Sequence, residues 1–517
     1  MFARILSAGV LGVDAYIVQV EAHLETALIT FTTVGLPDSA IKESKERVSA
    51  AIKNSGFRYP NKKVTINLAP ADVHKEGTGF DLPMALGILA ATGEVSKDRL
   101  DRLIVLGELS LDGVIRPVQG ALPMALVARD SGMEGIIVPE ANSHEAAIVD
   151  GIKVYPMETL IDTVDFLNGE VEIEPFTVDV NSVFSRYREY DIDFSDVRGQ
   201  EHVKRALEVA AAGGHNVLMI GPPGSGKTML AKRLPTILPD LELDEALETT
   251  KVYSVAGKLA RGTALVATRP FRSPHHTISD AGLIGGGRIP KPGEVSLAHN
   301  GVLFLDELPE FRKNVLEVMR QPMEDGNVVL SRASISLSYP ANFMLAAAMN
   351  PCPCGYATDP ARECRCNSGQ IQRYMSKVSG PLLDRIDIHV EVPSVKWKQL
   401  SAERSGESSS VIQERVRMAR LIQRQRFANR KGMYCNADME SRDIEKYCKL
   451  DDECMNLLRH AITTLGLSAR AYHRIQKVAR TIADLSKSEQ ITAAHISEAI
   501  QYRSMDRDQW SISGSNY

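Results

Sequence analysis

The fold is decided by one stretch of the sequence, which reads Val217-Leu218-Met219-Ile220 and then Gly221-Pro222-Pro223-Gly224-Ser225-Gly226-Lys227-Thr228. The four apolar residues are typical of a buried parallel strand, and the residues after the stretch are typical of a helix. The last eight residues match the pattern G-x-x-x-x-G-K-S/T, whose glycines let backbone N–H groups close around phosphate oxygens. The strand–loop–helix order therefore predicts that all eight residues bind the phosphates of ATP. We expect Lys227 to reach the β- and γ-phosphates and the Thr228 hydroxyl to ligate Mg²⁺.

A second motif supplies the carboxylates that such a site needs. Gly301–Leu305 is an apolar strand that ends in Asp306 and Glu307. We expect Asp306 to hold the Mg²⁺, and Glu307 to orient and polarise the water that attacks the γ-phosphate. The two motifs together predict a P-loop α/β core that hydrolyses ATP.

The bulk composition is that of an ordinary multidomain globular protein. The chain has 517 residues, 44% apolar and 24% charged, and a length of this order predicts roughly two to four domains. Because no apolar run is long enough to span a membrane and the N-terminus makes a poor signal peptide, we expect a cytoplasmic protein with no membrane partner. The net charge is −5, and residues 1–180 carry 15 basic and 26 acidic side chains. This asymmetry predicts an acidic front domain and a mildly basic motor.

Several further motifs resemble those of the AAA+ ATPases. Asn350 follows the apolar strand Leu345–Met349 and resembles the sensor-1 residue, which helps place the attacking water. Gln200 ends a short segment that resembles the adenine-contact segment of that class. Arg385 resembles the arginine finger, by which a neighbouring subunit completes the catalytic site.

The C-terminal part also resembles an AAA+ element. Leu467–Arg474 is similar to the start of the sensor-2 helix, and Arg470 is the expected γ-phosphate contact. Arg474 lies one turn further on the same helix face and is the alternative.

Three segments resemble, in amino-acid sequence, the magnesium-chelatase-related AAA+ proteins of bacteria of the ComM/YifB type. They are Arg272–Ser279, Leu283–Gly287 and Asn350–Gly355. The resemblance covers essentially the whole chain and implies a homo-hexameric ATPase. Competence-associated members are DNA helicases that drive branch migration during the integration of transforming DNA. The resemblance therefore implies an ATP-dependent DNA translocase, with single-stranded and branched DNA and recombination proteins as partners.

The order of elements in the first 170 residues resembles the proteolytic domain of Lon protease, an α+β domain with the ribosomal-S5-like fold. Peptidase chemistry of this kind needs a Ser nucleophile and a Lys base. The corresponding positions hold Gly79 and Leu122, so we expect no peptidase activity. We expect the neighbouring His74 and Lys75 to be solvated surface residues.

Two loops are candidates for DNA contact. Residues 261–296 are rich in Gly and Pro, and residues 328–337 are expected to form one limb of a β-hairpin. Cations on such loops would bind phosphates without reading the base sequence. Ordinary solvated loops or subunit contacts are the alternative, and for His275 and His276 we favour structural or intersubunit roles. The candidate DNA contacts are Arg272, Arg288, Lys291 and Arg332.

Four of the seven cysteines form a cluster shortly after Asn350. They are Cys352, Cys354, Cys364 and Cys366. Four thiolates can close a tetrahedral structural Zn²⁺ site, although the C-x-C spacing is tighter than the usual C-x-x-C. Free thiols are the alternative. Cys435, Cys448 and Cys454 lack such spacing and are expected to be core thiols.

The sequence thus predicts a multidomain α/β protein. We expect a Lon-like, S5-like domain over 1–170, a linker over 171–194 and an AAA+ core over 195–395 that contains the Cys-rich loop 352–366. A linker over 396–410, a helical lid over 411–505 and a tail over 506–517 follow, and within the lid we expect helices over Asp452–Leu465 and Ala469–Leu485. The alternative to DNA translocation is a chelatase-like ATPase that remodels a protein or a metal–cofactor complex.

Overall fold

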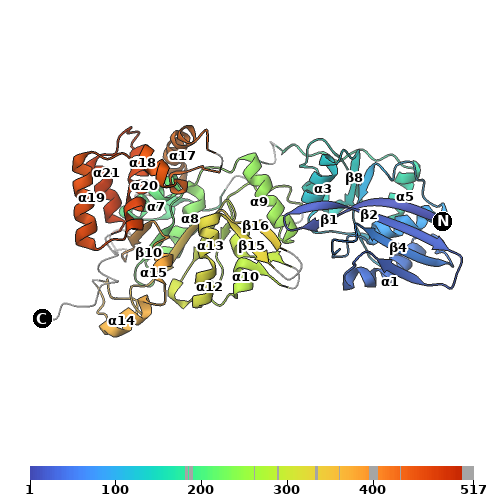
Figure 1. Ribbon diagram of the computed structural model, residues 1–517, viewed down its shortest axis with the longest axis horizontal. Coiled ribbons are helices and arrows are strands. Elements are labelled where there is room, and N and C mark those ends of the chain that lie inside the picture. The colour runs from blue at the N-terminus through green and yellow to red at the C-terminus, as the bar shows by residue number, and fades with distance from the viewer. Residues whose placement is uncertain are drawn as a thin grey trace.

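The structure has three regions in a row (Figure 1). The computed structural model describes residues 1–180, 184, 190–260, 262–287, 290–331, 336–359, 361–394, 406–430 and 432–503. A mixed sheet with its helices lies at one end, a parallel sheet lies in the middle, and a helical bundle lies at the other end. Among the described residues, no helix is both long and apolar enough to cross a bilayer.

The first region is built on one seven-stranded sheet with the order β3-β4-β2-β1-β5-β8-β9. Neighbours β1, β2 and β4 run antiparallel, whereas β3 is parallel to β4, and β5, β8 and β9 continue parallel from β1. The strands are β1 (Phe2–Leu11), β2 (Asp14–Glu25), β3 (Phe31–Val34), β4 (Lys63–Ala69), β5 (Leu103–Val105), β8 (Gly135–Pro139) and β9 (Lys153–Met157). A small ribbon pairs β6 (Glu108–Leu109) with β7 (Ile115–Arg116).

Helices cover both faces of this sheet because successive side chains of a strand point to opposite faces. Along β1, Ile5 enters the apolar cluster that holds α1, α2 and α5, and Leu6 enters the cluster that holds α3 and α4. The helices are α1 (Ser39–Asn54), α2 (Asp81–Thr92), α3 (Ala121–Asp130), α4 (Ser143–Ala146) and α5 (Leu160–Asn168).

The middle region is a five-stranded sheet with the order β11-β14-β17-β10-β18, and every pair in it is parallel. This confirms the predicted parallel α/β sheet. Because parallel strands share one carboxyl edge, the segments that follow β10, β14 and β17 meet there. The strands are β10 (Val217–Ile220), β11 (Phe271–Arg272), β14 (Val302–Leu305), β17 (Met344–Met349) and β18 (Ile388–Glu391).

Shorter elements surround this sheet. The helices are α7 (Glu201–Gly213), α8 (Lys227–Ile237), α9 (Leu243–Val255), α10 (Asp280–Ile284), α11 (Glu294–Leu297), α12 (Lys313–Val318), α13 (Arg320–Asp325), α14 (Ser368–Met375) and α15 (Gly380–Leu383). Two antiparallel pairs join β12 (Gly285–Gly286) to β13 (Lys291–Pro292) and β15 (Asn327–Ser331) to β16 (Ser336–Pro340). The β15–β16 pair confirms the predicted hairpin, but residues 328–337 belong to both of its strands instead of forming one limb.

The C-terminal bundle shares its core with the middle sheet. Val217 and Met219 of β10 belong to the same apolar cluster as Ile475 and Ile482 of the bundle, because α17 and α20 pack on α7. The helices are α17 (Ser409–Arg426), α18 (Ser441–Tyr447), α19 (Asp452–Leu465), α20 (Ala469–Leu485) and α21 (Ala493–Gln501). The sequence had predicted helices with the bounds of α19 and α20, so those predictions are confirmed.

The first and middle regions meet where α3 packs on α9. Buried Glu145 accepts hydrogen bonds from the Ser254 hydroxyl of α9 and, at 3.0 Å, from the Leu122 N–H of α3. Val178 and Val180, from the segment expected to be a linker, pack against the apolar cluster at this junction.

Candidate nucleotide-hydrolysis site

The phosphate-binding loop lies between the end of β10 and the start of α8. Gly224 and Gly226 have φ values of 76° and 91°, which lie in the left-handed region that favours glycine. A Cβ atom at Gly221 would overlap the carbonyl oxygen of Val392, which follows β18. The glycines of the motif are therefore required by the backbone that this structure adopts.

Lys227 is buried at the start of α8 and is held by three oxygen atoms. Its Nζ donates to the carbonyl oxygens of Gly221 and Pro222, at 2.7 and 2.9 Å, and to Asn350 Oδ1 at 3.2 Å. Burial lowers the pKa of the Lys227 ammonium, although the carboxylates of Asp306 and Glu307 act in the opposite direction. The lysine thus lies between the loop and the end of β17, within reach of both.

Two oxygen donors meet beside this lysine. The Thr228 hydroxyl donates to Asp306 Oδ2 at 2.6 Å, which joins the start of α8 to the end of β14. Hydroxyl and carboxylate oxygens are the ligands that Mg²⁺ prefers. Both residues are accessible, so the pair can bind a hydrated ion.

Glu307 follows Asp306 in a left-handed backbone conformation with a φ of 54°. Its N–H donates to Asp306 Oδ1 at 2.9 Å, and its Oε2 lies 3.3 Å from His276 Nδ1. The His276 ring also packs against His275, with 4.1 Å between the ring centroids.

From the sequence we expect only a structural or intersubunit role for His276, and the contact with Glu307 is not foreseen. One signal could have found it. His276 follows β11, and β11 is the parallel neighbour of β14, so residues beyond both strands approach the same edge of the sheet.

Gln200 joins the segment before α7 to the phosphate-binding loop. Its backbone has a φ of 58°, and its Nε2 donates to the carbonyl oxygens of Ser225, at 2.9 Å, and Pro393, at 2.8 Å. The side chain therefore links the loop to the residues after β18.

The two candidate sensor-2 arginines have different surroundings. Arg474 pairs with buried Asp387, which also accepts a hydrogen bond from the Asn216 N–H at 3.1 Å. Arg470 is exposed and forms no ion pair with any residue in the described ranges. Arg470 is thus the arginine of the two whose charge is available to a ligand.

Arg385 lies at the amino edge of the parallel sheet, whereas the phosphate-binding loop of the same chain lies at the carboxyl edge. The arginine precedes β18, and its carbonyl oxygen accepts from Asn216, which precedes β10, at 3.1 Å. The loop follows the other end of β10. Arg385 is 8% exposed and its guanidinium pairs with Glu324, while its Nη1 donates to the Pro381 carbonyl at 2.7 Å.

The structure describes two of the four candidate DNA contacts. Arg272 forms a two-point ion pair with Glu294, at 2.6 and 2.7 Å, so its charge is balanced within the chain. Lys291 is exposed, with its Nζ 3.4 Å from Gln119 Oε1 of the first region. Arg288 and Arg332 lie outside the described residues.

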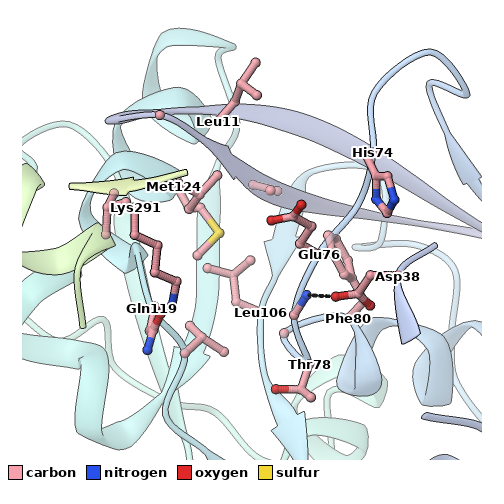
Figure 2. A pocket seen from close by; sticks show the side chains of 18 of the residues that line it. Leu11, Asp38, His74, Glu76, Thr78, Phe80, Leu106, Gln119, Met124 and Lys291 are labelled. Atoms are coloured by element: carbon pink, nitrogen blue, oxygen red, sulfur yellow. Dashed lines mark hydrogen bonds between the residues drawn. The ribbon is translucent and has the colours of Figure 1, made fainter. Parts of the chain in front are cut away.

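A cavity of about 440 Å³ lies where the sequence resembles the Lon peptidase cleft. Figure 2 shows Lys291 and Gln119 on one side of it and Asp38 and Glu76 on the other. Gly79 lines the cavity where a peptidase would place its nucleophile.

Three residues near this cavity, Leu122, His74 and Lys75, test the expectations for the first region. Leu122, at the position of the general base, is fully buried, and His74 is exposed as expected. The prediction that Lys75 is a solvated surface residue is wrong. Its side chain is fully buried, and its Nζ donates to the Val73 carbonyl oxygen at 2.8 Å. Burial lowers the pKa of this ammonium.

The four clustered cysteines lie together. Their sulfur atoms are all within 4.8 Å of one another, which is close enough to ligate a single ion. The Sγ of Cys352 lies 3.3 Å from that of Cys354 and 3.7 Å from that of Cys364, so these thiols are not disulfide-bonded. The other three, Cys435, Cys448 and Cys454, are buried as predicted.

The chain matches family models and individual relatives among known proteins. Three family models match it: "Magnesium chelatase, subunit ChlI" over residues 193–400, "Subunit ChlI of Mg-chelatase" over 20–142, and "Magnesium chelatase, subunit ChlI C-terminal" over 406–503. The chain is 45% identical over 508 residues to competence protein ComM of Haemophilus influenzae, with 98% of each chain covered. It is 46% identical over 499 residues to YifB of Escherichia coli, with 96% of each covered. A shorter match joins it to Lon protease 2 of Bacillus subtilis, at 27% identity over 146 residues, which covers 28% of this chain and 26% of that protein.

Proposed function

This chain belongs to the magnesium-chelatase-related family of the ComM/YifB type, and from that premise we propose that it is a hexameric ATPase that moves DNA strands. One observation carries the ATPase part of the proposal. Two hydrogen-bonded pairs, Lys227 with Asn350 and Thr228 with Asp306, meet at the carboxyl edge of the sheet, and the Glu307 N–H donates to Asp306. Each side chain in this group has a role in phosphoryl transfer.

The roles follow from the contacts. Lys227 exchanges its carbonyl and amide acceptors for β- and γ-phosphate oxygens, while the backbone N–H groups of the loop bind the same phosphates. Thr228 and Asp306 hold the Mg²⁺. When bound, that ion neutralises the charge that develops on the phosphates. Glu307 polarises the attacking water, which requires that its carboxylate leave the His276 ring.

We assign Arg385 to the site of a neighbouring subunit, because it lies across the sheet from its own phosphate-binding loop. Arg470 reaches the γ-phosphate from α20 when the bundle closes on the nucleotide. A site completed from two subunits requires a ring, and the family resemblance makes that ring a hexamer.

We propose that DNA is the substrate moved by ATP hydrolysis. The proposed activity is branch migration during homologous recombination, and the proposed partners are recombination proteins. The H. influenzae relative is named a competence protein, and residues 261–296, which are rich in Gly and Pro, carry several cations. Lys291, Arg288 and Arg332 are the proposed phosphate contacts. Arg272 is the weakest candidate, because Glu294 already balances its charge.

We assign the first region to an inactive Lon-like, S5-like domain, the middle region to the AAA+ core and the bundle to its lid. The match to a Lon protease and the chelatase models support this layout. We also place a structural Zn²⁺ at the four clustered cysteines, whose sulfur atoms lie close enough to share one ion.

A chelatase-like remodeller is the second candidate, because all three matching family models describe a magnesium chelatase subunit. It would hydrolyse ATP at the same site but would be stimulated by a protein or a metal–cofactor complex instead of DNA.

The test compares the intact chain with Glu307→Gln on forked and four-way DNA junctions. We expect ATP hydrolysis that DNA stimulates, DNA binding that weakens as salt increases, and strand exchange only in the intact chain. ATP hydrolysis without DNA binding or strand movement would refute the DNA proposal and favour the remodeller.

A further inference from the structure

The four-cysteine loop lies directly against the phosphate-binding loop. Gly355 directly follows Cys354 and has a φ of 87°. A Cβ atom built at this glycine would lie 2.5 Å from Pro223 Cδ. Real Cβ atoms do not approach another carbon so closely, so the two loops touch with no room for a methyl group. The same loop begins two residues after Asn350, which accepts a hydrogen bond from Lys227.

The sulfur positions match the geometry of a metal tetrathiolate. A tetrahedral ion with bonds of about 2.3 Å to sulfur places its ligands about 3.8 Å apart. The pairs of Cys352, Cys354 and Cys364 are 3.3, 3.6 and 3.7 Å apart, and Cys366 completes the set within 4.8 Å. The Cys366 N–H also faces Cys364 Sγ at 3.4 Å, as N–H groups do around thiolate ligands.

The loop has little else to hold its shape. Of its described residues from Pro353 to Cys366, only Gly355 is buried, and the others are partly or fully exposed. A segment with so little apolar burial does not offset the conformational entropy of ordering its backbone. A metal ion that cross-links the four sulfur atoms would supply the stabilisation that this loop does not gain from apolar packing.

We propose that the four cysteines bind one Zn²⁺, and that this ion presses Gly355 against Pro223 and thereby holds the phosphate-binding loop in the conformation that accepts ATP. The second half of this proposal rests on the ATPase function proposed above. Zn²⁺ is the expected ion because four thiolates around a single closed site are typical of structural zinc.

The path from the ion to the nucleotide is short. The Gly355 N–H donates to the Cys352 carbonyl oxygen at 3.0 Å, which fixes a tight turn between two of the ligands. That turn touches Pro223, and the carbonyl oxygen of the preceding residue, Pro222, accepts from Lys227 at 2.9 Å. A displaced turn would therefore release Pro223 and shift an acceptor of the lysine that binds phosphate.

The metal is tested on the full chain purified without chelators. Elemental analysis is expected to find one zinc per chain, and Co²⁺ added to the metal-stripped chain is expected to give the thiolate-to-cobalt absorption of a tetrahedral site. Cys364→Ser should lose both signals, and Cys448→Ser, at a buried cysteine outside the cluster, should keep them. Iron in place of zinc, or metal content near zero with no cobalt spectrum, would overturn the metal assignment.

The contact with Pro223 is tested by Gly355→Ala, which keeps all four thiols and adds the one methyl group that does not fit. We expect an unchanged zinc content, affinity for a fluorescent ATP analogue weakened about tenfold, and a smaller change in kcat at saturating ATP. Gly466→Ala is the matched control, because Gly466 also has a left-handed φ, of 64°, and a Cβ atom built there meets no atom within 4 Å. Adding Pro223→Ala to Gly355→Ala should recover part of the lost affinity, since it removes the ring that the methyl group meets and leaves only the strain of the left-handed φ at residue 355.

These outcomes separate the proposals. If Gly355→Ala keeps its zinc and binds the ATP analogue as the intact chain does, the ion does not act on the phosphate-binding loop, and the ATPase function stands. If the intact chain binds zinc but no nucleotide, the ATPase function fails while the metal site stands.

Discussion

Arg474 in α20 pairs with Asp387, which immediately precedes β18 of the parallel sheet. Asp387 also accepts from the Asn216 N–H, and its Oδ2 lies 3.7 Å from His215 Nδ1. This buried group joins the helix that carries Arg470 to the segment that carries Arg385. We therefore expect a displacement of the bundle to be transmitted through this group to Arg385.

The first prediction separates Arg474 from Arg470. Arg474→Ala leaves Asp387 buried without its main partner, so we expect a loss of about 3 kcal/mol in the free energy of unfolding, measured by urea denaturation. Arg470→Ala should leave stability unchanged and lower kcat for ATP about 10²-fold, because it removes one donor to the γ-phosphate. The opposite pattern would make Arg474 the nucleotide contact.

The second prediction concerns pH. Burial alone would raise the pKa of Asp387, but Arg474 and His215 hold it well below its ordinary value. A depressed carboxyl pKa stabilises the fold above the unfolded value, near about pH 4, and the contribution is lost as pH falls toward the folded value.

The measurement for this prediction compares the intact chain with Asp387→Asn. The difference in unfolding free energy between the two should be constant above about pH 5 and shrink below about pH 4. A difference that stays constant down to the acid transition would show that folding does not depress the pKa of Asp387.

The third prediction concerns the candidate general base. Glu307→Gln should bind ATP as the intact chain does and lower kcat on the order of 10²- to 10⁴-fold, because an amide cannot accept the proton of the attacking water. Glu310→Gln is the control. Glu310 lies on the same surface and pairs with Lys377 at 3.1 Å. Equal activity of the two variants would remove Glu307 from the mechanism.

The fourth prediction tests the assignment of Arg385 to a neighbouring site. Arg385→Ala and Lys227→Ala should each be inactive, with rates lowered about 10³-fold or more. An equimolar mixture should regain part of the ATPase activity, because a subunit with Lys227→Ala still offers its arginine to a neighbour with an intact loop.

Glu324→Gln is the control for this mixing experiment. It removes the partner of Arg385 within the chain and should keep the activity. A mixture that remains as inactive as its components would contradict an arginine that acts between subunits.

The local parts of the fold could be predicted from the sequence. The helices α19 and α20 have the predicted bounds because their ends are marked by side chains that cap them, Asp451 and Ser468. The β10 strand and the loop after it were predicted because apolar pattern and glycine spacing are local properties.

Contacts between distant segments could not be predicted in this way. Lys75 was expected at the surface because lysine usually is, yet neighbouring segments of the first region bury it completely. Likewise, nothing near Arg385 in the sequence indicates Glu324, which lies 61 residues away.

Residue pattern and spacing are sufficient to predict the phosphate-binding loop, the carboxylate pair after an apolar strand and the cluster of four cysteines. Which side chains contact one another became known from the folded chain. In the folded chain His276 contacts Glu307, Gly355 packs against Pro223, and Arg474 pairs with Asp387. The physical reason is that backbone conformation depends on near neighbours, whereas the partner of a side chain depends on how the parallel strands are ordered and which ends they share.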